Sequence, residues 1–382
     1  MNSEDIKQVY PNISEILDND SILGLKFCSK GTFKLNNELN SLKGLKYYYS
    51  DQHTKEIITH NLKWALSKEK KPKFQFIYIL LPTNCNQKCY GCFTGKDLET
   101  FPVKSSDTFY SKKELDNILE FALEHDVKAV VYGGSGELFT WHGSIDYIKN
   151  IHKRGLKSVI FTNGSLLDEN KLKILNDLEA ALIISIRDTN EHNHNLLVGV
   201  NNFKTVLKNI DTAISLGFSE NNRLAIEIPA TTDNESRIIN DLLPCLRHKN
   251  VIPMIEEFLQ PKNCDKTYSA HNFTESRTFF NNLVCMDNTL GYKWLPELGT
   301  RVLGQPKCER PLFSFTVLPN RDIADCPAGF KVFGNIKDEA IQNIIYSSKY
   351  KSQITDFKFC ACSVFYSDND KDIPVEQKAI YT

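Results

Sequence analysis

Apolar and polar positions follow two different rhythms along the middle of the chain, and the two rhythms alternate. Short apolar, β-branched runs predict strands that are buried on both faces. Stretches with apolar residues every three or four positions predict amphipathic helices. The predicted strands are residues 74–81, 129–134, 158–164, 181–186, 224–230 and 251–259. The predicted helices between them are residues 111–125, 143–154, 168–178, 203–217 and 235–248.

Strict alternation of strands and helices implies a parallel sheet with right-handed crossover connections. Six predicted strands are fewer than the eight of a closed TIM barrel. We therefore predict an α/β fold, a partial (β/α)6 TIM-like barrel that is open on one side. In such folds the functional residues lie at the C-terminal ends of the strands.

The two ends of the chain do not share this alternation. Residues 1–72 lack a clear rhythm and end in a lysine-rich, solvated segment. After about residue 260 the alternation stops, and cysteines follow. The expected organisation is an N-terminal extension (1–72), a barrel core (73–262), and a linker with a small C-terminal cysteine-rich domain (263–382).

Composition and charge narrow the class of protein. Of 382 residues, 41% are apolar and 24% are charged, as in folded soluble proteins. The formal net charge of -1 argues against nucleic-acid or anionic-membrane binding, which needs a basic surface. No run reaches the roughly 18 apolar residues of a membrane span, and the polar start is unlike a signal peptide. We expect a cytoplasmic protein with neither a nucleic-acid nor a membrane partner.

Eleven cysteines are unusual for such a chain. Without an export signal, a disulfide framework is a poor interpretation, and short spacings favour metal or redox sites. The cysteines stand at positions 28, 85, 89, 92, 245, 264, 285, 308, 326, 360 and 362.

The first group, Cys85-x₃-Cys89-x₂-Cys92, falls in the loop after the first predicted strand. Three thiolates are one short of a closed four-cysteine site, so a metal bound here keeps a position for a ligand. Sulfur ligands favour zinc, copper(I) or iron–sulfur clusters. The alternatives are a structural zinc loop completed by a remote ligand, and three cysteines without a common role.

At these residues the chain resembles the radical S-adenosylmethionine (radical SAM) superfamily, whose hallmark is this cysteine spacing. The aromatic Tyr90 after the second cysteine also matches. The resemblance implies a [4Fe–4S] cluster held by Cys85, Cys89 and Cys92, with the fourth iron open to the amino and carboxylate groups of SAM. It also implies reductive cleavage of SAM to a 5′-deoxyadenosyl radical, which abstracts a substrate hydrogen.

The second predicted strand ends in a glycine-rich turn that resembles the family's GGE motif, which holds the SAM amino group. Here the motif carries an insertion and reads Gly133-Gly134-Ser135-Gly136-Glu137. Glycines allow a backbone to approach a ligand closely. The alternative is an ordinary glycine-rich turn between a strand and a helix.

Further candidates for SAM contacts lie on later strands: Thr162 and Asn163, Ser185 and Arg187, and Glu227. A serine suits the ribose, and an arginine suits the carboxylate in a forked geometry, unless Arg187 is simply solvated. Glu227 is a charge within an apolar strand and needs a partner. His192 and His194 follow the fourth strand in a polar stretch, and we assign them no role.

The second cysteine group consists of Cys308, Cys326, Cys360 and Cys362. Residues 313–326 predict a hairpin, and residues 333–348 predict a turn and a helix. This stretch resembles the SPASM and twitch domains, although Arg321 replaces the usual turn glycine. The resemblance implies one auxiliary [4Fe–4S] cluster, for which Cys264 or Cys285 could supply a ligand. The alternative is a zinc site.

The resemblance implies a radical SAM enzyme that works with a reductant such as flavodoxin or ferredoxin. Our first expectation for its substrate is a peptide, which would be cross-linked or oxidised, and residues 1–72 would recognise a leader peptide. The alternatives are an oxidoreductase for a sugar-like or nucleoside-like small molecule, and a zinc-bound interaction module without catalytic activity.

Overall fold

Strands dominate the centre of the computed structural model, which describes residues 52–92, 109–133, 135–220, 222–257, 273–292, 310–327 and 331–355. The strands within these residues are β1 (Phe76–Ile79), β2 (Ala129–Tyr132), β3 (Lys157–Thr162), β4 (Ala181–Ser185), β5 (Leu224–Ala230), β6 (Ile252–Glu257), β7 (Ser314–Val317), β8 (Asp322–Ala324) and β9 (Val332–Asn335). They form one sheet in the order β6-β5-β4-β3-β2-β1-β7-β8-β9. Neighbours from β6 to β7 are parallel, and the last two pairs are antiparallel.

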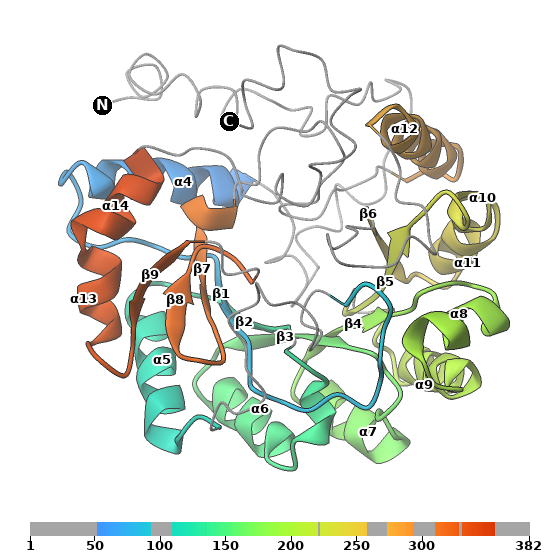
Figure 1. The fold of residues 1–382 in the computed structure, drawn as a ribbon, viewed down its shortest axis with the longest axis horizontal. Coiled ribbons are helices and arrows are strands. Elements are labelled where there is room, and N and C mark those ends of the chain that lie inside the picture. Colours follow the sequence, from blue (N-terminus) through green and yellow to red (C-terminus); the bar gives the residue numbers. More distant parts are fainter. Residues whose placement is uncertain are drawn as a thin grey trace.

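The helices are α4 (Gln52–Ala65), α5 (Lys112–Glu124), α6 (Ser144–Lys153), α7 (Glu169–Asp177), α8 (Glu191–Val198), α9 (Phe203–Ser215), α10 (Glu235–Arg237), α11 (Leu243–His248), α12 (Phe273–Thr289), α13 (Ile341–Tyr346) and α14 (Ser348–Thr355). Figure 1 shows α5, α6, α7 and α9 along the outer side of the curved sheet. This arrangement confirms the predicted α/β fold with a parallel sheet, and it is that of a partial barrel.

Local sequence signals explain most of these boundaries. Helix α5 begins at a capping box, in which the Ser111 hydroxyl accepts from the Glu114 backbone and the Glu114 carboxylate accepts from the Ser111 backbone. Its inward face buries Leu115, Ile118 and Leu119 against the sheet. All residues of β1 and β2 are buried, as expected for parallel strands covered on both faces. Removing the cap with Ser111→Ala would cost about 1 kcal/mol.

The predicted C-terminal hairpin is present as β7 and β8, and β7 adds to the sheet beside β1. The two strands run parallel, with Phe76 opposite Ser314 and Ile79 opposite Val317. Nothing in the local pattern of either strand encodes this long-range pairing. The consequence is that the hairpin extends the barrel sheet directly.

Arg321, which stands where a turn glycine was expected, adopts a left-handed backbone with φ of 75°. Its guanidinium is buried and donates to the Glu114 carboxylate at 2.9 Å and to the carbonyls of Pro319 and Phe109 at 3.0 and 2.9 Å. Although Glu114 is partly withdrawn from water, its bonds with Arg321 and Ser111 lower its pKa to about 2. The arginine thus fills the position of a glycine and fastens the hairpin to α5.

Residues 52–65, within the expected N-terminal extension, form α4 and pack against the C-terminal helices. The Trp64 ring meets Tyr346 edge-on at 5.6 Å between centroids and lies 6.4 Å from Tyr350. The Asn61 amide donates to the carbonyls of Lys73 and Leu312. Residues 1–51 lie outside the described residues, so the predicted leader-peptide role stays a prediction.

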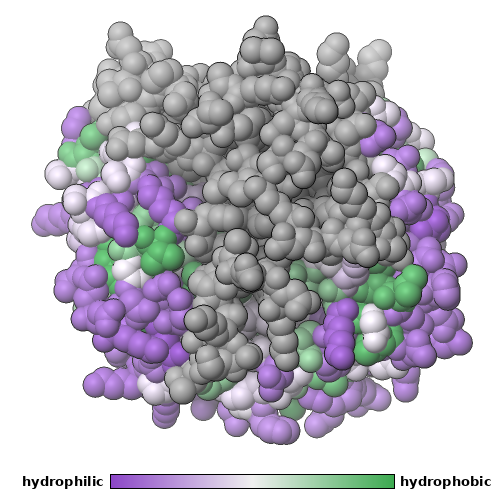
Figure 2. All heavy atoms as spheres, in the orientation of Figure 1, coloured by the Kyte–Doolittle hydropathy of each residue, from purple (hydrophilic) through white to green (hydrophobic). Residues whose placement is uncertain are grey.

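On the face seen in Figure 2, the coloured part of the surface is mainly hydrophilic, with some hydrophobic patches between the hydrophilic residues. Large apolar side chains that are exposed include Leu196 on α8 and Leu207 on α9. None of the described helices combines the length and apolar character needed to span a bilayer.

Candidate active site

The cysteine loop leaves the C-terminal end of β1 and rests on the end of α8. The backbone N–H groups of Lys88 and Tyr90 donate to the carbonyls of Val198 and Leu197 at 2.9 and 2.7 Å. Gly199 ends α8 with φ of 70°, and a Cβ there would lie 3.1 Å from the Lys88 carbonyl oxygen. The loop is therefore held by the last carbonyls of α8, which a helix leaves without partners of its own.

The three cysteines of the loop are present as thiols. Cys85 is exposed, whereas Cys89 and Cys92 are half-buried. Burial raises the pKa of Cys89 to about 11, with Arg187 opposing the shift and the other two cysteines adding to it. Although Cys85 is exposed as a residue, partial removal of its sulfur from water also raises the pKa of its thiol. The thiols of Cys85 and Cys89 are therefore protonated near neutral pH, and a bound metal would be needed to convert them to thiolates.

The chemistry of this donor set fits an iron–sulfur cluster. Three soft sulfur ligands lie in one short loop and interact electrostatically with one another. As they stand, no three histidine, cysteine, aspartate or glutamate side chains among the described residues are grouped closely enough to hold a single metal ion. Cys85, Cys89 and Cys92 are the residues that could hold a cluster.

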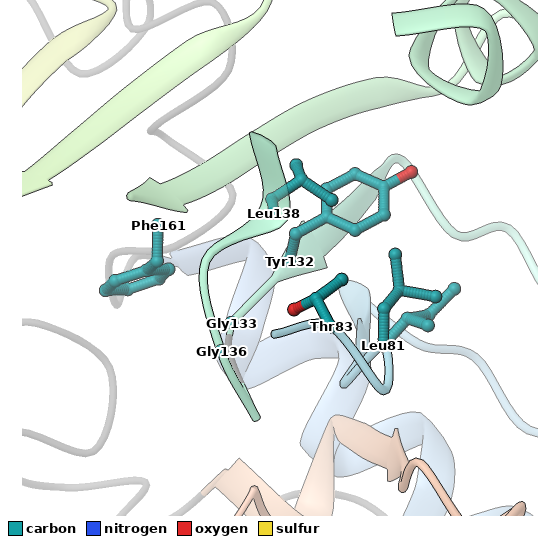
Figure 3. Close-up of a pocket in the computed structure, with 8 residues that line it drawn as sticks. Leu81, Thr83, Tyr132, Gly133, Gly136, Leu138 and Phe161 are labelled. Atoms are coloured by element: carbon teal, nitrogen blue, oxygen red, sulfur yellow. The ribbon is translucent and has the colours of Figure 1, made fainter. Parts of the chain in front are cut away.

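The glycine-rich turn after β2 packs directly against the segment that leads into the cysteine loop (Figure 3). A Cβ at Gly136 would lie 2.2 Å from the Thr83 carbonyl oxygen, so only glycine fits there. The Ser135 hydroxyl donates to the Leu81 carbonyl, and the Glu137 N–H donates to the Asn84 carbonyl at 2.9 Å. The turn thereby fixes where the cysteine loop begins.

Gly133 is crowded as well, because a Cβ there would lie 2.4 Å from the Tyr78 ring. Gly134 lies outside the described residues. A small pocket beside this turn is lined by Ile79, Leu81, Thr83, Tyr132, Gly133, Gly136, Leu138 and Phe161.

The buried carboxylate of Glu137 joins the turn after β2 to the end of β3. It accepts from the Thr162 hydroxyl and the Asn163 backbone N–H, both at 2.8 Å, and from the Phe139 N–H at 3.2 Å. Burial raises its pKa, although the three hydrogen bonds oppose the shift. The Glu137 side chain therefore connects the turn after β2 to the end of β3, and the Thr162 hydroxyl is one of the groups that bind it. We call this connection the strut.

A second connection runs from the cysteine loop to the turn after β3. The Asn163 amide donates to Asn86 at 2.9 Å, and the Asn86 amide donates to the Ser165 hydroxyl at 2.8 Å. Asn86 directly follows Cys85. The loop is thus tied to the β3 turn by side chains and to α8 by backbone.

Arg187 lies between the acidic groups of the barrel and the cysteine loop. Neighbouring strands place Ser185 opposite Glu227, and the Ser185 hydroxyl donates to that carboxylate. Burial raises the pKa of Glu227 to about 7, with Arg187 opposing and Glu256 adding to the shift. Burial disfavours the Arg187 charge, but Glu227, Cys89 and Cys92 outweigh it and raise the Arg187 pKa. Arg187 also forms a side-chain hydrogen bond with Cys89, so it is not a solvated rim residue.

The region that contains the cysteine loop and these strand ends also matches a known protein family. Residues 79–242, which run from the end of β1 through the strands that carry these side chains, match the model of the Radical SAM superfamily. This part of the chain, 79–242, is therefore similar to radical SAM domains.

Solved structures share the fold of this chain. SuiB of Streptococcus suis matches with a TM-score of 0.63 at 14% identity, over 86% of this chain and 83% of that one. SuiB bound to its precursor peptide SuiA matches with a TM-score of 0.60 at 15% identity, over 93% and 81%. The protein anSMEcpe with bound AdoMet matches with a TM-score of 0.56 at 18% identity, over 72% and 81%.

A curated relative is the tungsten-containing aldehyde ferredoxin oxidoreductase cofactor-modifying protein of Pyrococcus furiosus. It is 29% identical over 109 residues, which are 28% of this chain and 29% of that protein. The chain therefore matches less than a third of the length of this relative.

Helix α8, which supports the cysteine loop, is absent from the predicted elements. Its first five residues are polar, so apolar residues do not recur at helical spacing. The signals for this helix are its two ends, where Asn190 is the N-cap and Gly199 the C-cap. His194 is buried, accepts from the Arg187 N–H at 3.2 Å, and lies 3.1 Å from Asn202 through Nε2. Burial lowers the pKa of His194, whereas His192 is exposed. The two histidines therefore do not form a pair.

Asp188 anchors the start of the α8 region and was not singled out from the sequence. Both of its oxygens accept from the Arg237 guanidinium, at 3.1 and 2.6 Å. Arg237 precedes a π-helical turn at Ile238–Leu242, and Pro244 follows that turn. A proline supplies no backbone N–H. Arg237 is half-buried, and nothing near it in the sequence indicates that its partner is Asp188.

Two of the predicted auxiliary ligands lie among the described residues. Cys326 is buried at the end of the β7–β8 hairpin, and Cys285 is exposed on α12. Cys264, Cys308, Cys360 and Cys362 lie outside the described residues. The auxiliary cluster therefore stays a prediction from the sequence.

Proposed function

We propose that this chain is a radical SAM enzyme that modifies a peptide. Cys85, Cys89 and Cys92 hold a [4Fe–4S] cluster at the C-terminal end of β1, and SAM binds beside it. The observation that carries the proposal is the cysteine loop itself, with three thiols, of which Cys89 and Cys92 interact with Arg187, within the region that matches the family model.

When bound, such a cluster supplies the electron that cleaves SAM to a 5′-deoxyadenosyl radical, which takes a hydrogen atom from an otherwise unreactive C–H bond. The chain's own residues bind SAM and orient it beside the cluster. Backbone carbonyls of the turn that contains Gly133 and Gly134 accept from the SAM amino group. Arg187 offers its fork of donors to the carboxylate, and Ser185 bonds the ribose. Glu227 balances the charge of Arg187 beneath them.

The proposed SAM site is completed by residues of the cysteine loop and of the ends of β2 and β3: Tyr90, Ser135, Gly136, Glu137, Thr162 and Asn163. Several of them already have protein partners, as described above. Their part is to hold the loop and the strand ends in position, so that the groups that touch SAM keep their places. A rigid surround of this kind also excludes water from a reactive radical.

A peptide substrate is supported by the fold shared with SuiB, which has been solved with its precursor peptide SuiA. A second candidate is a small molecule, such as a sugar-like or nucleoside-like compound. It is supported by the relative that modifies the cofactor of an aldehyde ferredoxin oxidoreductase. In both cases we propose that Cys308, Cys326, Cys360 and Cys362 hold one auxiliary [4Fe–4S] cluster, and that a flavodoxin or ferredoxin supplies electrons in the cytoplasm.

The test is production of 5′-deoxyadenosine by protein reconstituted without air and mixed with SAM and a strong reductant. The Cys89→Ala variant should lose this product, whereas Cys245→Ala, which removes an exposed cysteine from α11, should keep it. Product that persists in Cys89→Ala would contradict the site. Metal analysis that finds zinc and no iron would favour an interaction module instead.

A further inference from the structure

Gln87 is a buried amide inside the cysteine loop, between Cys85 and Cys89. The residue is only 9% exposed. Its Oε1 accepts a hydrogen bond from the Cys89 thiol at 3.2 Å. Its Nε2 is buried and has no hydrogen-bond partner in the part of the chain that the structure describes. Such a donor without an acceptor is unfavourable, and in native proteins it calls for a reason.

Loading a cluster changes what Gln87 faces. Cys89 must lose its proton to bind iron, so it can no longer donate to Oε1. The amide oxygen would then face a negatively charged sulfur, which is repulsive. A half-turn about the last side-chain bond exchanges Oε1 and Nε2, and the amide then presents an N–H donor to the sulfur. One rotation removes the repulsion and gives the Nε2 group its acceptor.

We propose that Gln87 donates an N–H hydrogen bond to the Cys89 sulfur in the loaded enzyme and thereby raises the reduction potential of the cluster. This inference rests on the proposed function. A donor stabilises the extra negative charge of a reduced cluster, and hydrogen bonds to the sulfurs are among the factors that set cluster potentials. Gln87 is a positioning and tuning residue, because it acts through Cys89.

The experiment compares wild type with Gln87→Leu and Gln87→Met, two apolar side chains of similar size. Gln342→Leu, on the exposed surface of α13, is the matched control. Each protein is reconstituted without air, its iron is counted, and the midpoint potential of the SAM-sensitive paramagnetic signal is measured by redox titration. We expect both Gln87 variants to shift to more negative potential, while Gln342→Leu matches wild type.

Unchanged potentials in fully loaded Gln87 variants would overturn the inference and leave the proposed function intact. Loss of the cluster in both variants, with the control loaded, would show that Gln87 only supports the loop, and would also overturn it. A wild-type protein that binds no iron would instead contradict the proposed function itself.

Discussion

Removal of the Glu137 carboxylate tests whether this buried group joins two strand ends beneath the cysteine loop. Glu137→Ala takes away the acceptor of three donors, the Thr162 hydroxyl and the backbone N–H groups of Asn163 and Phe139. A typical hydrogen bond contributes about 1 kcal/mol net, so the expected loss is about 3 kcal/mol. The control is Glu169→Ala, since Glu169 is an exposed residue that forms an ion pair with Lys173 at the surface, where such pairs contribute little to stability.

The assay is urea unfolding of the metal-free protein with its thiols kept reduced, followed by circular dichroism. We expect a clear fall in the unfolding midpoint for Glu137→Ala and almost none for Glu169→Ala. We also expect weaker iron uptake by Glu137→Ala, because the Glu137 N–H holds the Asn84 carbonyl at the start of the loop. A loss below about 1 kcal/mol would refute the strut interpretation.

Three further predictions concern the supports of the site. Gly199→Ala should speed hydrogen exchange of the Lys88 and Tyr90 amides, which bond to the end of α8. The control is Gly155→Ala, because Gly155 has a similar φ of 77° and no atom within contact of an added Cβ, and this variant should not change the exchange. Equal effects of the two variants would contradict the docking of the loop on α8. Arg321→Ala should destabilise more than Arg321→Gly by about 1 kcal/mol in urea unfolding, because glycine tolerates φ of 75° and alanine does not. Glu227 has a raised pKa, so its contribution to stability is present below about pH 4.5 and is lost as pH rises through about 7. Wild type should therefore lose stability relative to Glu227→Gln over that range, by roughly 3 kcal/mol, and parallel stability–pH curves would argue against a buried Glu227.

The sequence pattern predicts the part of this fold that depends on local periodicity. The six parallel strands from β1 to β6, and every helix between them except α8, follow from apolar runs and amphipathic stretches. Their order along the chain also places the cysteine loop at the C-terminal edge of the sheet, since parallel strands end on the same side.

What the pattern does not predict depends on contacts between distant residues. Helix α8 does not show apolar periodicity, because one of the two residues that it buries is the polar His194, which bonds to Asn202, and the other is Val198. The pairing of β7 with β1 joins residues that are far apart in the chain. Likewise, neither sequence neighbours nor spacing reveal that Glu137 serves Thr162 and Asn163, or that Arg187 lies between Glu227 and Cys89.

The most direct test of the account is the iron content and paramagnetic spectrum of a variant that lacks all four C-terminal cysteines, Cys308, Cys326, Cys360 and Cys362. The loop with Cys85, Cys89 and Cys92 then remains as the proposed cluster site. The account predicts about four irons per chain and, after reduction, a signal that changes when SAM is added. A colourless protein without iron, or a signal that does not respond to SAM, would contradict it.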